Sequence, residues 1–249
     1  MKSTLFRVLS PIKTEIKRVR FRYRHSENYQ NCQALRNTND INTDYSLKEY
    51  DKYKCIFVRI PKCASRSISK SLFGNLGGGH RTISKYSIIF SQSEFKNYFK
   101  FTFVRNPWDR LVSAYHFLRE GGIRKYDQEW SDNLLNFYPN FDTFLKEWVN
   151  RVDVSSGLHF KPQYEFICDK DHQIMVDFVG YFENLEDDFN YVKNKLGINS
   201  TLASLNKTAS RKKDYRSYYT DDTAKLVADV YRDDIRIFGY DFDNSNFRR

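Results

Sequence analysis

The fold of this chain is decided by residues 100–118, which read KFTFVRNPWDRLVSAYHFL. Residues 101–104 are mostly apolar and predict a short buried strand. Asn106 offers a side-chain oxygen to cap a helix, and Pro107 suits the first helical position, where a missing N–H costs nothing. The apolar residues that follow share one helical face: Leu111, Val112, Tyr115 and Leu118. The stretch therefore predicts a strand joined directly to a helix.

Polar side chains sit at this joint. Arg105 leaves the end of the predicted strand beside the helix N-terminus, and Ser113 lies further along the helix. Open α/β sheets bind anions where strand ends meet helix N-termini. An ordinary joint with an exposed arginine would have the same local sequence, so this stretch alone leaves both interpretations open.

Residues 55–73, which read CIFVRIPKCASRSISKSLF, repeat the strand–loop–helix pattern. A strand is predicted by the apolar residues Ile56, Phe57, Val58 and Ile60. Pro61 ends it, and Gly74 can end the following helix. The loop brings two cations and two hydroxyls to a helix N-terminus, an arrangement that suits a phosphate group: Lys62, Ser65, Arg66 and Ser67. It is not a Walker A loop, because the G-x-x-x-x-G-K-[ST] pattern is absent.

Together the two stretches resemble the phosphosulfate-binding elements of sulfotransferases, most closely the Golgi carbohydrate sulfotransferases and their bacterial relatives. Residues 60–67 resemble the 5′-phosphosulfate loop, and residues 103–115 resemble the 3′-phosphate element. The resemblance continues through residues 182–189 and 213–215 to residues 238–240, so it covers most of 53–242. It implies a three-layer α/β/α fold like that of P-loop proteins, with a mostly parallel sheet.

The resemblance also implies a donor, 3′-phosphoadenosine 5′-phosphosulfate (PAPS), with 3′,5′-adenosine bisphosphate (PAP) as product, and it implies no metal. Lys62 is then expected to neutralise charge on the 5′-phosphate as the sulfuryl group leaves. The rest of the 5′-loop would hold that phosphate through Cys63, Ala64, Ser65, Arg66 and Ser67. Arg105 and Ser113 would hold the 3′-phosphate. In the basic segment 206–216, Arg211 and Lys212 are the expected further 3′-phosphate contacts, although a solvated charge run is an equal alternative there.

Two histidines are candidates for the base that takes a proton from the acceptor hydroxyl. His80 follows three glycines and lies between the two donor-binding stretches, as a histidine does in the bacterial relatives. His159 belongs to a His-x-x-Pro-Gln segment that resembles a family segment near the active site, where Gln163 is expected to orient acceptor or donor. The structural alternatives are an exposed loop histidine at position 80 and a hydrogen-bonded structural histidine at position 159.

The remaining sequence predicts a basic N-terminal arm and polar linker over 1–52, a sulfotransferase domain over 53–242 and a polar tail over 243–249. Within these, residues 25–50 are predicted as a loop or linker and residues 123–140 as a substrate-facing loop. Apolar spacing predicts a helix face over 141–152, a strand over 174–179 and a helix over 185–196. Thr220 is predicted to cap a final helix that extends through Tyr231.

Composition narrows the function classes. The 249 residues carry a formal net charge of +10, which suggests anionic partners such as a nucleotide, an acidic glycan, nucleic acid or a membrane surface. The cysteines are scattered without metal spacing and are expected to be reduced: Cys32, Cys55, Cys63 and Cys168. We see no apolar run of membrane-spanning length and no secretory signal. We therefore expect a cytoplasmic protein, or one of the Golgi lumen if the chain is a fragment of an anchored protein.

Three function classes remain open. The first is a PAPS-dependent sulfotransferase whose acceptor is a hydroxyl group, expected on a glycan or polysaccharide. The second is a nucleotide-dependent kinase or other phosphoryl transferase, which would need a Mg²⁺ carboxylate and usually a Walker A loop. The third is a non-catalytic polyanion-binding protein, with the basic N-terminus available for peripheral contacts. None of the recognised nucleic-acid-binding motifs is present, so no specific nucleic-acid partner is expected.

Overall fold

Three short parallel strands lie at the centre of the structure, a computed structural model that describes residues 15–16, 18–20, 23–37, 44–203 and 214–244. The strands are β1 (Cys55–Val58), β2 (Phe99–Val104) and β3 (Phe178–Tyr181), and β2 lies between the other two. In the register, Phe57 pairs with Phe101, and the two rings stack with their centroids 4.7 Å apart. β1 and β2 are mostly apolar and almost fully buried because helices cover both sides of the sheet.

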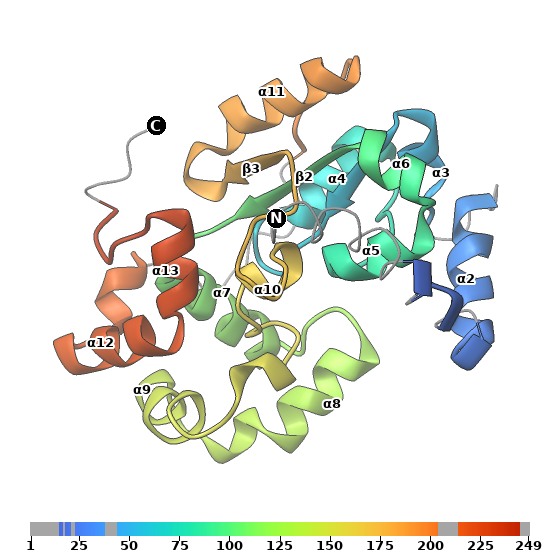
Figure 1. The fold of residues 1–249 in the computed structure, drawn as a ribbon. Helices are drawn as coiled ribbons and strands as arrows, with labels where there is room; N and C mark the ends of the chain where they lie inside the picture. The colour runs from blue at the N-terminus through green and yellow to red at the C-terminus, as the bar shows by residue number, and fades with distance from the viewer. Residues whose placement is uncertain (1–14, 17, 21–22, 38–43, 204–213, 245–249) are drawn as a thin grey trace, which may run out of the picture.

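Helices connect and surround the strands (Figure 1). The α-helices of the described residues are α2 (Ser26–Asn37), α3 (Lys48–Lys52), α4 (Ser65–Phe73), α5 (Ile83–Ile89), α6 (Gln92–Asn97), α7 (Pro107–Arg119), α8 (Lys125–Asn133), α9 (Phe141–Phe144), α10 (Tyr164–Ile167), α11 (Leu185–Leu196), α12 (Asp221–Val230) and α13 (Arg232–Phe238). Short helical turns are η1 (Leu135–Phe137), η2 (Leu145–Val149), η3 (Val154–Ser156), η4 (Phe182–Asn184) and η5 (Tyr215–Tyr218). The predicted three-layer α/β/α fold with a parallel sheet is confirmed.

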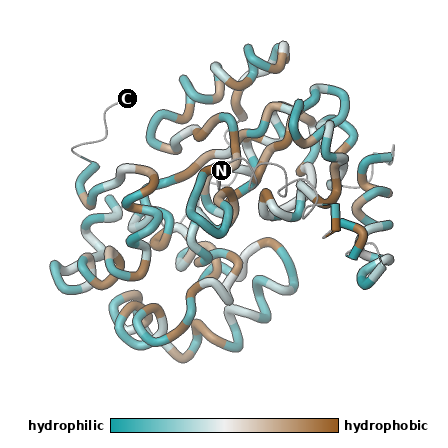
Figure 2. Tube along the Cα trace, viewed as in Figure 1, coloured by the Kyte–Doolittle hydropathy of each residue, from teal (hydrophilic) through white to brown (hydrophobic). Residues whose placement is uncertain are grey.

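The described residues build two hydrophobic cores. The first joins the strands to α4, α5 and α11. The second joins one face of α7 to α9, η2 and α12, and Figure 1 shows α8, α9 and α12 gathered in a lobe below the strands. In Figure 2 the central strands are brown while the outer turns of the surrounding helices are largely teal. Helix α7 therefore connects the two parts, because it begins just after β2, which lies in the first core, and packs into the second core.

The two joints that the sequence predicted are present. Asn106 caps α7, since its side-chain oxygen accepts hydrogen bonds from the backbone N–H of Trp108 (3.0 Å) and Asp109 (3.4 Å). Helix α4 ends at Gly74, whose φ of 70° is the left-handed conformation that glycine adopts most readily. Helix α11 ends in the same way at Gly197. These features depend on neighbours in the sequence, and they were predicted correctly.

Two predicted loops are wrong. Much of residues 25–50 is helical, because α2 packs on the sheet core through Cys32 and is fixed by Arg36, whose Nη2 lies 2.7 Å from carboxylate oxygens of both Asp51 and Glu94. Residues 125–133 form α8 rather than a loop, and Asp127 accepts backbone hydrogen bonds at the start of that helix. Both segments are polar, so their helices are stabilised by contacts with distant segments that local composition does not show.

Three further boundaries differ from the prediction. The third strand begins at Phe178, while Ile174 makes only an isolated bridge with Cys168. The predicted final helix ends at Val230 and is followed by α13. The helix face over 141–152 changes to a π-helical turn in η2, and Val152 is 39% exposed rather than buried.

Some predictions concern residues that the structure does not describe. The first part of the basic N-terminal arm, residues 1–14, lies outside the described residues, and the domain boundaries at 52 and 242 stay predictions. Within the described ranges, no helix combines the length and the apolar composition needed to cross a bilayer.

Candidate functional site

A cleft of about 1760 Å³ opens at the carboxyl end of β1 and β2. Its walls come from the loop after β1, the first turn of α4, the glycine loop 76–80, the inner face of α7, the start of α8 and the segment from η4 into α11. Since parallel strands end at the same edge of a sheet, segments that are far apart in the sequence meet there. The cleft therefore lies where both predicted anion-binding stretches end.

The loop between β1 and α4 has an unusual backbone. Lys62 (φ 68°) and Ala64 (φ 53°) both adopt the left-handed conformation although neither is glycine. Such conformations cost of order 1–3 kcal/mol and concentrate at functional sites. They lead into the first turn of α4, where Ser65, Arg66 and Ser67 line the cleft. The first N–H groups of a helix have no partner within the helix and are available to a ligand. This is the geometry of an anion-binding loop at a helix N-terminus.

Two buried arginines hold this loop in place. Arg110 donates from Nε to the carbonyl oxygen of Pro61 (3.0 Å) and from Nη2 to that of Lys161 (2.9 Å). Arg105 donates from Nη1 to the carbonyl oxygen of Lys62 (3.0 Å). The guanidinium groups replace the hydrogen bonds that regular secondary structure would give these carbonyls, which stabilises the strained loop.

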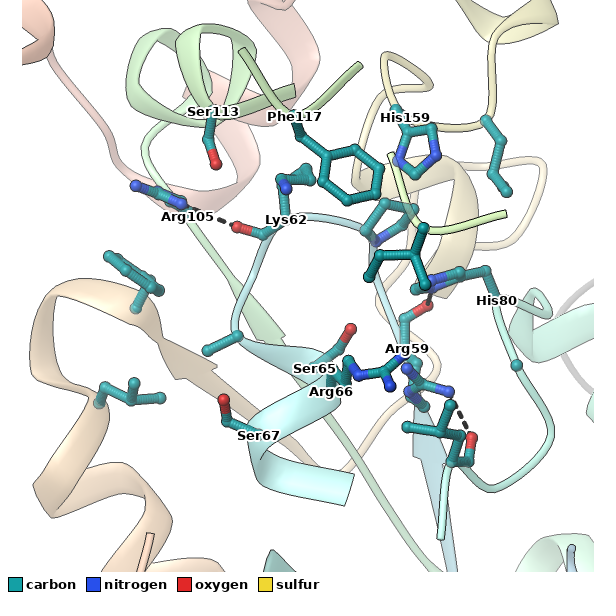
Figure 3. Close-up of a pocket in the computed structure, with 18 of the residues that line it drawn as sticks. Arg59, Lys62, Ser65, Arg66, Ser67, His80, Arg105, Ser113, Phe117 and His159 are labelled. Carbon is teal, nitrogen blue, oxygen red and sulfur yellow. Dashed lines mark hydrogen bonds between the residues drawn. The ribbon is translucent and has the colours of Figure 1, made fainter. Parts of the chain in front are cut away.

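Lys62 lies at the centre of the cleft (Figure 3). Its Nζ lies 3.8 Å from the centroid of the Phe117 ring, within cation–π distance. Burial, with the nearby charge of Arg105, lowers the pKa of Lys62 to about 7. A lysine in this state gains its full charge when an anion binds beside it.

Arg105 faces the same space from the end of β2. Its Nε donates to Asp109 Oδ2 at 2.6 Å, and its guanidinium lies 3.9 Å from the centroid of the Phe182 ring. Burial lowers its pKa to about 10, so the group stays charged at neutral pH. Ser113, two turns into α7, points its hydroxyl toward Arg105 and Lys62 (Figure 3).

Gln163 connects the two anion-binding stretches from behind the cleft. Its amide accepts from the backbone N–H of Arg105 (2.9 Å) and donates to the carbonyl of the same residue (2.8 Å). The thiol of Cys63 donates to the same amide oxygen at 3.2 Å, and burial raises the pKa of that thiol to about 12. Gln163 is fully buried and does not line the cleft, so its side chain acts on the positions of these residues.

The two histidines are held by different partners. His80 Nδ1 lies 2.9 Å from the carbonyl oxygen of Arg59, and burial, with the charge of Arg59, lowers the pKa of His80 to about 3. His159 Nε2 lies 3.0 Å from Asp127 Oδ1, and burial lowers the pKa of this imidazole although the carboxylate raises it. His159 Nδ1 is buried without a hydrogen-bond partner among the described residues. Both rings are therefore neutral at pH 7.

The cleft brings together most of the predicted site residues: Lys62, Ala64, Ser65, Arg66, Ser67, His80, Arg105, Ser113 and His159. The side chain of Cys63 points into the core instead, which leaves only its backbone for a ligand. Arg211 and Lys212 lie outside the described residues.

Phe117, Arg59 and Asp127 are among the cleft residues that sequence reasoning missed. Phe117 lies four positions after Ser113, so helical spacing could have placed it on the same face. Arg59 is a charged residue at the end of an apolar strand, and this position could have indicated a functional role. Asp127 carries no such signal, because its role depends on contact with His159, 32 residues away. Across the described residues, no three His, Cys, Asp or Glu side chains are arranged to hold a metal ion.

Comparison with known proteins agrees with this geometry. The sequence model of the sulfotransferase family matches residues 47–241. Human carbohydrate sulfotransferase 14 is 29% identical over 168 residues, which is 57% of this chain and 44% of that protein. Human carbohydrate sulfotransferase 10 is 26% identical over 189 residues, 61% of this chain and 53% of that protein.

An uncharacterised protein of Archaeoglobus fulgidus is 32% identical over 108 residues, 43% of this chain and 75% of that protein. The chain spans about half the length of the carbohydrate sulfotransferases that it matches. No solved structure gives a significant match. Because the family match covers residues 47–241, which include the strands and the cleft, the chain belongs to the sulfotransferase family.

Proposed function

We propose that this protein transfers a sulfuryl group from PAPS to an acceptor hydroxyl group on a carbohydrate. The observation that carries the proposal is the convergence of two anion-binding elements in one cleft: the strained loop with the N-terminus of α4, and the joint of β2 and α7. A ligand with phosphate groups at two ends fits such a pair. Membership of the sulfotransferase family supports the choice of PAPS as that ligand.

The donor, when bound, supplies an activated sulfuryl group whose S–O bond to the 5′-phosphate breaks as a new S–O bond to the acceptor oxygen forms. Lys62 would neutralise the charge that develops on the 5′-phosphate, and the N–H groups of α4 with Ser65 and Ser67 would hold that phosphate. Arg105 and Ser113 would hold the 3′-phosphate, with Arg211 and Lys212 as further proposed contacts. These residues mainly position and stabilise charge, as in phosphoryl transfer.

His80 is the proposed base that takes the proton from the acceptor hydroxyl. It is neutral at pH 7, lines the cleft, and has Nε2 left for a ligand because Nδ1 faces a backbone carbonyl. His159 fits this role less well, because the nitrogen that faces away from Asp127 is itself buried. Its ring contacts Phe117, with centroids 5.1 Å apart, and supports the wall beside Lys62.

The carbohydrate acceptor is supported by the named relatives and by the rim of the cleft. Tyr45 and Tyr126 line it as aromatic side chains, and Arg124 lies over the Tyr45 ring at 4.8 Å from the centroid. Aromatic faces beside a cation suit the apolar faces and polar edges of sugar rings.

Calorimetric titration with PAP in EDTA, beside AMP and ATP, tests the donor site. We expect PAP to bind without metal and more tightly than AMP, and we expect Arg105→Ala to remove that preference. Equal binding of the three nucleotides, or binding that requires Mg²⁺, would exclude the proposed donor site and favour a phosphoryl transferase. Loss of all binding with rising salt, regardless of the nucleotide, would indicate a polyanion-binding protein instead. Transfer of labelled sulfate from PAPS to a panel of mono- and polysaccharides then tests the acceptor.

A further inference from the structure

Arg59 is a buried cation at the end of β1 that the proposed chemistry does not use. It is 3% exposed, and its Nη1 donates to the carbonyl oxygen of Leu76 in the glycine loop. The groups that act on its charge are Tyr50, Tyr86 and Arg66, and none of them is a carboxylate. Its Nε is buried without a hydrogen-bond partner among the described residues. Burying an arginine without a carboxylate partner lowers the stability of the folded protein, so its presence here calls for a functional explanation.

The backbone of the same residue fixes the ring of His80. The carbonyl oxygen of Arg59 lies 2.9 Å from His80 Nδ1, and a carbonyl oxygen can only accept a hydrogen bond. Nδ1 must therefore carry the proton. In a neutral imidazole the other nitrogen, Nε2, is then an acceptor, which is the form that a general base requires.

The segment between these two contacts is closely packed. A Cβ added to Gly77 would lie 2.5 Å from the hydroxyl oxygen of Tyr50, and one added to Gly78 would lie 2.5 Å from that of Tyr86. The loop therefore passes over two buried tyrosines with no room for side chains. Arg59 holds it at both ends, at Leu76 through the guanidinium and at His80 through the carbonyl.

The charges of the side chains that face His80 all lower its pKa. The charges of Arg59, Arg110 and His159 each disfavour the imidazolium form, and burial is the largest cause of the low pKa. The hydrogen bond from Nδ1 to the Arg59 carbonyl acts in the opposite direction and raises the pKa. No carboxylate is among these groups, and Arg59 has the largest effect of the three. The guanidinium charge therefore adds to burial in lowering the pKa of His80, in addition to holding its loop.

We propose that Arg59 is a positioning residue that holds His80 in the Nδ1–H tautomer with Nε2 directed to the cleft. The inference rests on the proposed role of His80 as the base. In the proposed reaction, Arg59 contacts neither the donor nor the acceptor, and it acts only through its effect on His80.

The test is nitrogen-15 NMR of histidine-labelled protein, with His80→Asn used to assign the ring signals. In the unmodified protein we expect the signature of a neutral Nδ1–H ring for His80 at pH 7. Arg59→Met should raise the pKa of His80 by about one unit and mix the two tautomers, because a charge and a loop contact are both removed. Arg59→Lys keeps the positive charge but lacks the guanidinium N–H groups that hold Leu76. The pKa of His80 should therefore stay low while its two tautomers still mix. An Nε2–H ring in the unmodified protein would overturn the inference, even if Arg59→Met failed to fold.

Activity gives a second readout. With Arg59→Met we expect turnover to fall at least twofold at pH 7, because part of the His80 rings would hold the wrong tautomer. We also expect the acid limb of the pH–rate profile to move to higher pH by about one unit, and PAP affinity to stay within threefold. An unchanged acid limb together with an unchanged NMR signature would overturn the positioning role. Failure of the proposed function is distinguishable, because full turnover in His80→Asn would reject His80 as base while leaving the NMR result for Arg59 intact.

Discussion

The affinity of this protein for PAP should fall steeply as pH rises above 7, because Lys62 must take up a proton to bind. Burial, with the charge of Arg105, lowers the pKa of Lys62 to about 7 in the ligand-free cleft. A bound phosphate supplies the missing countercharge and returns that pKa toward its ordinary value of about 10.5. The protonated form is thus stabilised only in the complex.

The size of the effect follows from this pKa. At pH 7 about half of the ligand-free molecules carry the proton on Lys62, and at pH 9 about one in a hundred does. The dissociation constant for PAP should therefore rise about 50-fold between pH 7 and pH 9, which corresponds to about 2 kcal/mol. The phosphate groups contribute little, because their second ionisation is nearly complete above pH 7.

Calorimetric titration at pH 7, 8 and 9 measures this change. Repeating the titrations in buffers with different ionisation enthalpies gives the number of protons taken up, which should approach one at pH 9. Lys62→Met serves as the control, because it should bind more weakly at pH 7 but show little change from pH 7 to pH 9. A wild-type affinity that changes less than threefold over this range would refute the reasoning. A Lys62→Met variant that retains the full loss would refute it as well, because another group would then be responsible.

Three substitutions test the scaffold of the site. Asn106→Ala removes the cap of α7, so the free energy of unfolding in urea should fall by about 1–2 kcal/mol, and an unchanged midpoint would contradict the capping role. Gly180→Ala would place a Cβ 2.6 Å from a ring carbon of Phe103. It should lower thermal stability by about 1–3 kcal/mol, whereas a neutral effect would show that the ring can move aside. Gln163→Leu leaves the N–H and carbonyl of Arg105 unpaired, so the free energy of unfolding in urea should fall by about 2–3 kcal/mol. Titration should also show weaker PAP binding. Unchanged PAP binding would show that Gln163 does not position the binding residues.

The sequence determined the local joints. The cap at Asn106, the helix start at Pro107 and the helix ends at Gly74 and Gly197 all depend on residues within one turn of each other. Short-range sterics and hydrogen bonds fix such features before any tertiary contact forms. For the same reason the sequence placed the loop residues and Arg105 at strand ends, and a parallel sheet then brings them to one edge.

The helices in polar segments could not be predicted from local sequence. Helices α2 and α8 were predicted as loops, since few of their residues are apolar. Helix α2 is fixed by the contacts of Arg36 with Asp51 and Glu94, 15 and 58 residues further along the chain. Whether a polar segment is helical there depends on partners that local sequence does not identify.

The chemistry of the site was decided only by the tertiary structure. Gln163 reaches Arg105 across 58 residues, and His159 reaches Asp127 across 32. The pKa of Lys62 and the protonated nitrogen of His80 depend on burial and on carbonyl oxygens that other segments bring into place. The sequence by itself therefore identified the family and the groups that carry charge. Only the packed structure set their protonation and direction, because desolvation and charge–charge interactions act through space rather than along the chain.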